Sequence, residues 1–151
     1  MDSNLIRALD YRDLPQLIPL FDAYRQFYKQ VSDPEAAEQF ITERINRTEA
    51  VIFGYFIEGQ LVGFTLLYPL FSSVRMKPFY LLNDLYVLPA YRNKHIGSAL
   101  LQHCQALAKS KNHAGIMLET EKTNDIGNHV YPASGFGKID TSNFYFWENK
   151  P

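Results

Sequence analysis

Residues 86–104, YVLPAYRNKHIGSALLQHC, connect an apolar segment to an amphipathic helix through a basic, polar turn. An apolar stripe at helical spacing marks the helix: Ile96, Leu100, Cys104 and Leu107. A helix N-terminus offers four unpaired N–H groups and about half a positive charge. With Arg92 and Lys94 in the turn, and Gly97 where the helix opens, the stretch favours a pyrophosphate site. An ordinary solvated loop that carries basic residues is the alternative.

The residues upstream of this turn predict three strands. Residues 79–88 form an apolar run that carries Asn83 and Asp84 in its middle. Residues 51–71 contain two more apolar runs on either side of Glu58-Gly59-Gln60, a pattern typical of a hairpin. The carboxylate of Asp84 is unusual in such a strand, because a buried charge is costly unless it is paired or functional.

The N-terminal part of the chain predicts a strand and a helix. Residues 4–10 alternate in polarity as a half-buried strand does. A helix follows from Asp13, and Pro15 suits its first turn. Its apolar residues recur at spacings of three and four: Leu14, Leu17, Ile18, Phe21, Tyr24 and Tyr28.

A second helix is indicated after residue 32, with two possible start signals. Asp33 can cap the helix with Pro34 at its first position, or Ser32 and Glu35 can form a capping box. The helix is expected to run to about Arg47. Its predicted buried residues are Phe40, Ile41 and Ile45.

Three elements are expected downstream of the opening stretch. Residues 115–120 form a short strand, and residues 124–136 form a helical turn ended by a proline and a glycine. Residues 143–149, NFYFWEN, are aromatic on both faces and predict a last strand covered on both sides. The order is therefore β-α-α-β-β-β-α-β-α-β, a single mixed α/β domain over residues 1–151.

Composition excludes several classes of function. The net charge of −1 gives no electrostatic basis for nucleic-acid binding. The single cysteine excludes a disulfide framework, and the histidines show no metal-ligand spacing, so no metal site is expected. No run of 18 apolar residues and no signal peptide is found, which indicates neither a membrane protein nor a secreted one. We expect a cytoplasmic protein.

Two segments together resemble the signatures of the GNAT superfamily of N-acetyltransferases. Residues 84–101, DLYVLPAYRNKHIGSALL, are similar to its acyl-CoA motif, in which a strand is followed by R/Q-x-x-G-x-G/A and a helix. Residues 124–136, NDIGNHVYPASGF, are similar to its second signature, Asn-x-x-Ala-x-x-apolar-Tyr-x-x-x-Gly-Phe, with Gly127 at the alanine position. The resemblance covers about residues 4–148, and LLNDLYV with AYRQFYKQ is most similar to members that acetylate polyamines, histone tails or free amino acids.

The resemblance implies the GNAT fold, an α/β (α+β) arrangement with a central mixed sheet of six to seven strands and about four helices. It implies acetyl-CoA as co-substrate, with a strand backbone along the pantetheine arm and the polar turn under the pyrophosphate. The implied cofactor-binding residues are Leu85, Tyr86, Val87, Arg92, Asn93, Lys94, His95, Ile96, Gly97, Ser98 and Asn124.

His95 departs from the family pattern, because it stands where the motif has its first glycine. Glycine at that position adopts φ > 0 without strain and lets phosphates approach the backbone. Histidine is among the residues enriched at φ > 0, at a cost of about 1–2 kcal/mol. Its imidazole can meet a phosphate or the adenosine, or it can point to solvent.

Acetyl transfer to a primary amine requires an acid and a base. A lysine-like amine is protonated at pH 7, and removing its proton costs about 4–5 kcal/mol. A base in a partly desolvated pocket can take this proton. By its motif position Tyr131 is the acid that serves the leaving thiolate. Asp84 is the preferred base or ammonium anchor. Glu119 and Glu121 are alternatives that alternation would place on one face of the next strand.

The acceptor side is implied by the early segment YRQFY, in which Tyr24, Phe27 and Tyr28 could surround an alkylammonium group. Core packing of the same residues is the alternative. We expect direct transfer in a ternary complex to a small amine or peptide, without a covalent intermediate because Cys104 lies on the buried stripe. A homodimer through NFYFW is expected, and a non-catalytic CoA-sensing module is the rival function.

Overall fold

The computed structural model describes residues 4–151, which group into two compact units, Met1–Glu119 and Thr120–Pro151. The first unit contains the sheet and three helices, and the second contains one helix. The elements are β1 (Leu5–Ala8), the 3₁₀ turn η1 (Tyr11–Asp13), α1 (Leu14–Phe27), α2 (Pro34–Asn46), β2 (Val51–Ile57), β3 (Gln60–Ser72), β4 (Lys77–Val87), the 3₁₀ turn η2 (Pro89–Tyr91), α3 (Ile96–Ser110), β5 (Ile116–Leu118) and α4 (Asp125–Ala133).

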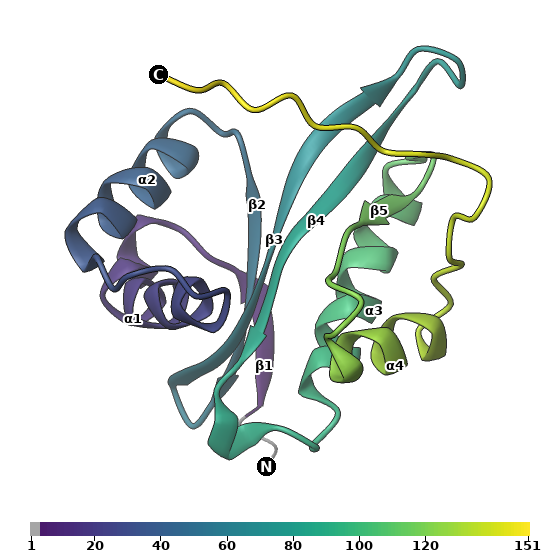
Figure 1. The fold of residues 1–151 in the computed structure, drawn as a ribbon. Coiled ribbons are helices and arrows are strands. Elements are labelled where there is room, and N and C mark those ends of the chain that lie inside the picture. The colour runs from purple at the N-terminus through teal and green to yellow at the C-terminus, as the bar shows by residue number, and fades with distance from the viewer. Residues whose placement is uncertain (1–3) are drawn as a thin grey trace. The chain divides into compact units, whose positions relative to one another are not determined.

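The first unit is a layered α/β structure around a five-stranded mixed sheet in the order β1-β2-β3-β4-β5. β1–β2, β2–β3 and β3–β4 are antiparallel pairs, and short turns join β2 to β3 and β3 to β4. β4 and β5 are parallel and are connected through α3. Helices α1 and α2 cover one face of the sheet and α3 covers the other (Figure 1). The described residues form fewer strands than the six or seven expected.

Local signals in the sequence explain where the helices begin. Asp33 caps α2, since its carboxylate accepts a hydrogen bond from the Ala36 N–H at 3.1 Å and Pro34 takes the first helical position. This confirms the first of the two expected start signals, Asp33 with Pro34, over a capping box of Ser32 and Glu35. The Ser32 hydroxyl instead donates to Asp22, at 2.6 Å.

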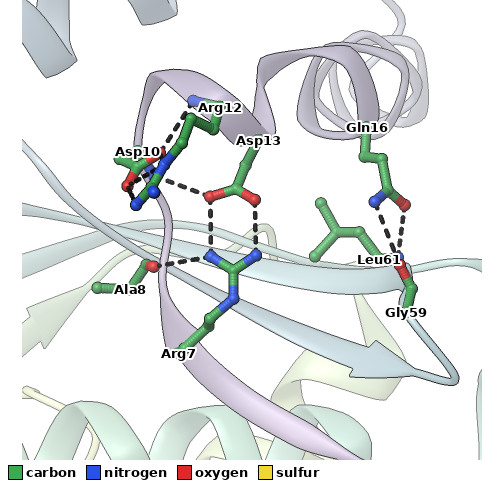
Figure 2. A network of polar contacts seen from close by, with 8 residues as sticks. All are labelled: Arg7, Ala8, Asp10, Arg12, Asp13, Gln16, Gly59 and Leu61. Atoms are coloured by element: carbon green, nitrogen blue, oxygen red, sulfur yellow. Dashed lines mark hydrogen bonds and ion pairs between the residues drawn. The ribbon is translucent and has the colours of Figure 1, made fainter.

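A polar network anchors the start of α1 to the sheet (Figure 2). Arg7 on β1 donates two hydrogen bonds to the carboxylate of Asp13, at 2.7 and 2.9 Å, and Asp13 also accepts from the Asp10 backbone. One turn further on, the Gln16 side chain bonds the Gly59 carbonyl and the Leu61 N–H in the β2–β3 hairpin. The network fixes the direction in which α1 crosses the sheet.

A β-bulge at Asn83 decides which face of the sheet Asp84 occupies. Leu66 pairs with Asp84, but its neighbour Leu67 pairs with Leu82, so Asn83 is an extra residue in β4. Cross-strand partners share a face and successive residues alternate between faces. Leu82 and Asp84 therefore lie on opposite faces of the sheet, although they are two residues apart. The bulge brings Asp84 to the side of α1 and α2.

Most predicted core residues are buried, but Phe40 on α2 is not. Ile41 is fully buried and Ile45 packs against the same cluster, as expected from the helical spacing. Phe40 keeps 40% of its surface exposed and stacks on Phe21, with ring centroids 6.0 Å apart. It lines a cavity instead of filling the core.

The second unit begins with α4 and continues without regular structure. The Asn124 side chain caps α4 by accepting from the Gly127 N–H at 3.1 Å, and Gly135 follows the helix at φ 92°. The prediction of a last strand at residues 143–149 is wrong, since these residues form no strand. The aromatic side chains that were expected to be covered are exposed: Phe144, Tyr145, Phe146 and Trp147. Alternating aromatic residues therefore reflect β-propensity here, without a neighbouring strand to pair with.

Candidate active site

A cavity of about 390 Å³ lies in the first unit between α1, α2 and the middle of β3 and β4. Its walls are mainly aromatic, with two charged groups among them. The lining residues are Phe21, Tyr24, Arg25, Ala36, Ala37, Phe40, Tyr68, Asn83 and Asp84. A volume of this size is at the small end for ligand sites.

Asp84 is the buried carboxylate of this cavity, with 2% of its surface exposed. One oxygen accepts a hydrogen bond from the Asn83 side chain at 2.8 Å. The other, Oδ2, is buried with no hydrogen-bond partner among residues 4–151. Burial raises the pKa of Asp84 to about 6, and the hydrogen bond from the Asn83 side chain opposes this only in part. A buried carboxylate with a spare oxygen can hold an ammonium group or accept its proton.

The expected aromatic triplet on α1 divides between two surroundings. Tyr24 lines the cavity, and its hydroxyl donates to the Asn83 carbonyl at 2.8 Å. Tyr28 packs edge-on against Tyr24 at 5.1 Å, while Phe27 is half exposed and lies outside the cavity lining. Sequence reasoning missed Phe21, Phe40 and Tyr68 as site residues. Helical spacing made Phe21 and Phe40 core candidates, and only the tertiary fold brings them together with Tyr68.

Beyond the cavity, the edge of β4 is open toward its carboxyl end. β4 pairs with β5 only from Tyr80 to Leu82. Within the described residues of the first unit, no strand lies beside residues 83–87 on that edge. Three expected pantetheine-binding residues therefore lie on a strand that is paired with β3 on one side and uncovered by a strand on the other, where the Arg92 side chain already bonds the Val87 carbonyl: Leu85, Tyr86 and Val87. An extended chain can add to such an edge as another strand does.

The polar turn after β4 has the backbone shape that the glycine motif requires. His95 adopts φ 62° and ψ 18°, in the left-handed region, and so confirms that this position needs a positive φ. The His95 side chain makes no capping hydrogen bond to α3, and a Cβ on Gly97 would meet no atom of the described residues within 4 Å. The first turn of α3, which includes Ile96 and Ser98, therefore offers N–H groups that this side chain does not cap, beside a glycine with open space around it. An anion fits there.

The basic side chains of the turn point in different directions. The Arg92 Nε donates to the Val87 carbonyl at 2.9 Å, and its guanidinium lies over the rings of Tyr86 and Phe27. Lys94 lies over the Tyr91 ring, with its Nζ 5.4 Å from the ring centroid. In this arrangement Arg92 braces the strand end. Exposed side chains complete the turn: Asn93, Lys94 and His95.

Asn124 and Tyr131 both lie in the second unit, the first as the N-cap of α4 and the second within it. The Asn124 amide donates to Thr120 at 2.9 Å and accepts from Gly127, so its side chain is held in place. Tyr131 is partly buried and packs edge-on against Phe136, with ring centroids 6.0 Å apart. The strand on which Glu119 and Glu121 were expected to share a face ends at Leu118. Both glutamates are exposed beyond it.

Cys104 is a buried core residue on α3. Its Sγ lies 3.9 Å from the Thr65 hydroxyl, and burial raises the pKa of the thiol to about 12. A thiol of this kind is not a nucleophile at neutral pH. In the described part of the chain, no cluster of three potential metal ligands occurs. None of the helices in residues 4–151 combines the length and apolarity needed to span a bilayer.

Comparisons with known proteins agree with this geometry. The model of the Acetyltransferase (GNAT) family matches residues 17–136. An uncharacterized N-acetyltransferase, YhfO, of Bacillus subtilis is 38% identical over 146 residues, which are 97% of each chain. The crystal structure of a probable acetyltransferase superimposes with a TM-score of 0.93 at 32% identity, over 97% of this chain and 99% of the other. An aminoglycoside N-acetyltransferase solved with CoA has the same fold, with a TM-score of 0.81 at 19% identity over 99% and 97% of the chains.

Proposed function

Because this chain belongs to the GNAT family and is an acetyl-CoA-dependent N-acetyltransferase, we propose that it acetylates a small primary amine bound in the α1–α2 cavity. The observation that carries the proposal is Asp84. Its carboxylate is buried in an aromatic-walled cavity, and one of its oxygens is left for a ligand. An ammonium group supplies both the charge and the hydrogen-bond donors that this oxygen lacks.

The transfer proceeds directly between the two substrates. Asp84 first holds the acceptor ammonium and then takes its proton, directly or through water. The free amine attacks the thioester carbonyl, so that a C–N bond forms and the C–S bond breaks. The CoA thiolate leaves with a proton from the Tyr131 hydroxyl. The acylated nitrogen then loses its second proton to solvent, and solvent restores the proton of Tyr131. The buried Cys104 thiol takes no part, and no covalent enzyme intermediate forms.

The first unit supplies most of the acetyl-CoA site in this proposal. The open edge of β4 bonds the pantetheine arm through the backbone of residues 85–87, and the N-terminus of α3 receives the pyrophosphate. Asn93, Lys94 and His95 lie beside the phosphates, and Arg92 keeps the strand end in place. By its motif position Asn124 is a further candidate pantetheine ligand.

Tyr131→Phe tests the acid. Removal of the hydroxyl should lower kcat by about a hundredfold, since proton transfer to a leaving group contributes on that order. The dissociation constant for CoA should change little, because the phenol acts on the transition state. Steady-state kinetics and calorimetry measure the two quantities. Tyr145→Phe, at an exposed tyrosine of the same unit, is the matched control. Full activity of Tyr131→Phe would remove Tyr131 from the mechanism.

The function itself is tested by thiol release from acetyl-CoA across amines of different classes. The panel contains polyamines, lysine analogues, free amino acids and histone peptides. Turnover with a small amine, and its loss in Asp84→Asn, supports the proposal. Measurable CoA binding without turnover of any amine would identify a sensing module of the same fold instead.

A further inference from the structure

The cavity presents two opposite charges, and neither forms an ion pair within residues 4–151. Asp84 contributes a carboxylate whose Oδ2 has no partner among residues 4–151. Arg25, a residue of intermediate exposure, contributes a guanidinium that donates one hydrogen bond, to the Val31 carbonyl at 3.2 Å. Among the described residues, no carboxylate lies within ion-pair distance of Arg25. Both charges therefore remain available to a ligand.

The nearest carboxylate along α1, Asp22, is occupied elsewhere. It accepts hydrogen bonds from the Ser32 hydroxyl, the Asp33 N–H and the Gln26 amide, at 2.6, 2.8 and 3.1 Å. The Ser32 bond is the largest cause that lowers the pKa of Asp22, so this carboxylate stays ionised and bound to the loop. Asp22 fixes the loop between α1 and α2. Arg25 also lowers the pKa of Asp22 through its charge, but it forms no ion pair with it and is among the residues that line the cavity.

The remaining wall is apolar and aromatic. Phe21 and Phe40 stack at 6.0 Å with an interplanar angle of 4°. The other lining residues besides the two charged ones are Tyr24, Tyr68, Ala36, Ala37 and the polar Asn83. The hydroxyl of Tyr68 adds no charge, because burial, with Asp84 nearby, raises its pKa to about 12. Such walls favour a compact hydrocarbon or aryl body over a polyhydroxylated one.

We infer that the acceptor is a zwitterion, a primary amine joined by a short apolar body to a carboxylate. The inference rests on the proposed function and names the substrate class of that site. Asp84 takes the ammonium end, Arg25 takes the carboxylate end in a charge-assisted hydrogen bond, and the aromatic wall covers the body between them. The charge of the ligand then complements the charge of the cavity at both ends.

The same geometry disfavours diamines and polyamines. One ammonium of a diamine can bind Asp84, but the other then lies beside the Arg25 guanidinium without a carboxylate to receive it. Like charges brought together in a partly desolvated site are repulsive, and they act against binding. Arg25 is therefore a specificity-determining residue that selects against a second cation.

A series of ligands matched in length tests the inference. Straight-chain amino acids from glycine to aminohexanoic acid, and phenylalanine for an aryl body, are compared with their methyl esters and with the corresponding diamines. Acceptor kcat/KM should peak at one chain length and fall about tenfold or more on esterification, because a hydrogen bond between charged groups is lost. Diamines should be poorer still. Calorimetry of the same compounds in the presence of CoA measures binding without turnover.

Charge reversal at Arg25 makes the test specific. Arg25→Glu should lower acceptor kcat/KM for amino acids about tenfold or more, raise it for diamines, and leave the KM for acetyl-CoA unchanged. Arg75→Glu, in the exposed β3–β4 turn, carries the same charge change outside the cavity and should alter neither. Arg25→Gln removes the positive charge without introducing a negative one, and so controls for an effect of Arg25→Glu on folding. Preference for diamines in the wild type, or equal effects of the two reversals, would overturn the inference. Zwitterion binding that Arg25→Glu abolishes, without turnover, would uphold it and refute acetyl transfer.

Discussion

Asp84 lies buried in the middle of a strand, and burial raises its pKa from 3.8 to about 6. Between these values the unfolded chain ionises while the folded protein keeps the proton, so stability falls as pH rises from about 4 to about 6. Asp84→Asn should remove this fall and stabilise the protein at neutral pH by up to about 3 kcal/mol. Urea denaturation below and above that range measures the change.

The activity of the same variant should move in the opposite direction. Wild-type kcat/KM for the amine should rise through a pKa near 6, as Asp84 loses its proton. Asp84→Asn should lack this step and lose about a hundredfold or more in activity. A gain in stability with a loss of activity is typical of a strained catalytic group. A variant that is less stable at neutral pH, or that remains active, would show that Asp84 is a structural residue.

His95 holds a left-handed conformation at φ 62° at the N-terminus of α3. His95→Gly should relieve strain and raise stability by about 1 kcal/mol. The affinity for CoA should be equal or tighter, because the substitution removes the exposed imidazole beside the N-terminus of α3 and lets a phosphate approach the backbone. Lys29→Gly, at φ 63° on the end of α1, is the control for strain without an effect on CoA. A marked, pH-dependent weakening of CoA binding would show that the imidazole is a phosphate ligand.

At the scale of elements, the first anchor of α1 is the ion pair of Arg7 and Asp13. Asp13 is 8% exposed at its side chain and Arg7 42%, so solvent screens the pair only in part. Asp13→Ala should cost about 1–3 kcal/mol, because it removes two bonds to Arg7 and one to the Asp10 backbone. Arg47→Ala, which breaks an exposed pair, should cost under about 1 kcal/mol.

The pH dependence of this anchor has the opposite sign to that of Asp84. The hydrogen bonds from Arg7 are the largest cause that holds the pKa of Asp13 below its usual value. The contribution is therefore complete above about pH 4 and is lost as pH falls through the folded pKa of Asp13. The wild type and Asp13→Ala should converge in stability in acid. A constant difference across the pH range would mean that packing, and not the ion pair, fixes α1.

What the sequence could predict depended on how local each signal was. The cap at Asp33, the turn at Gly59 and the positive φ at His95 each depend on a few neighbouring residues. The first was one of two start signals considered, the second was predicted, and the third was implied by the motif glycine that His95 replaces. The bulge at Asn83 depends on the register between two strands, which no single strand encodes. Asp84 could therefore be identified as an unusual charge, but its face could not. Phe40 was misplaced because helical spacing does not distinguish a core from a cavity wall.

At the scale of the whole molecule, the expected homodimer stays a prediction, and the C-terminal aromatic segment is where it can be tested. Phe144, Tyr145, Phe146 and Trp147 are 69%, 92%, 92% and 82% exposed, an amount of aromatic surface that is unusual outside an interface. If this segment joins two copies, Phe146→Ser with Trp147→Ser should convert the dimer to a monomer. Light scattering after size exclusion, at matched concentrations, measures the mass.

The β3–β4 turn offers a control with a comparable loss of exposed apolar surface. Phe71 and Met76 flank that turn and are 80% and 88% exposed. Phe71→Ser with Met76→Ser should leave the dimer intact, because association is expected to depend on the C-terminal segment and not on apolar surface in general. A wild-type monomer, or a dimer that persists without both C-terminal aromatics, would refute this interface. Loss of the dimer in both double variants would mean that the turn contributes to it as well.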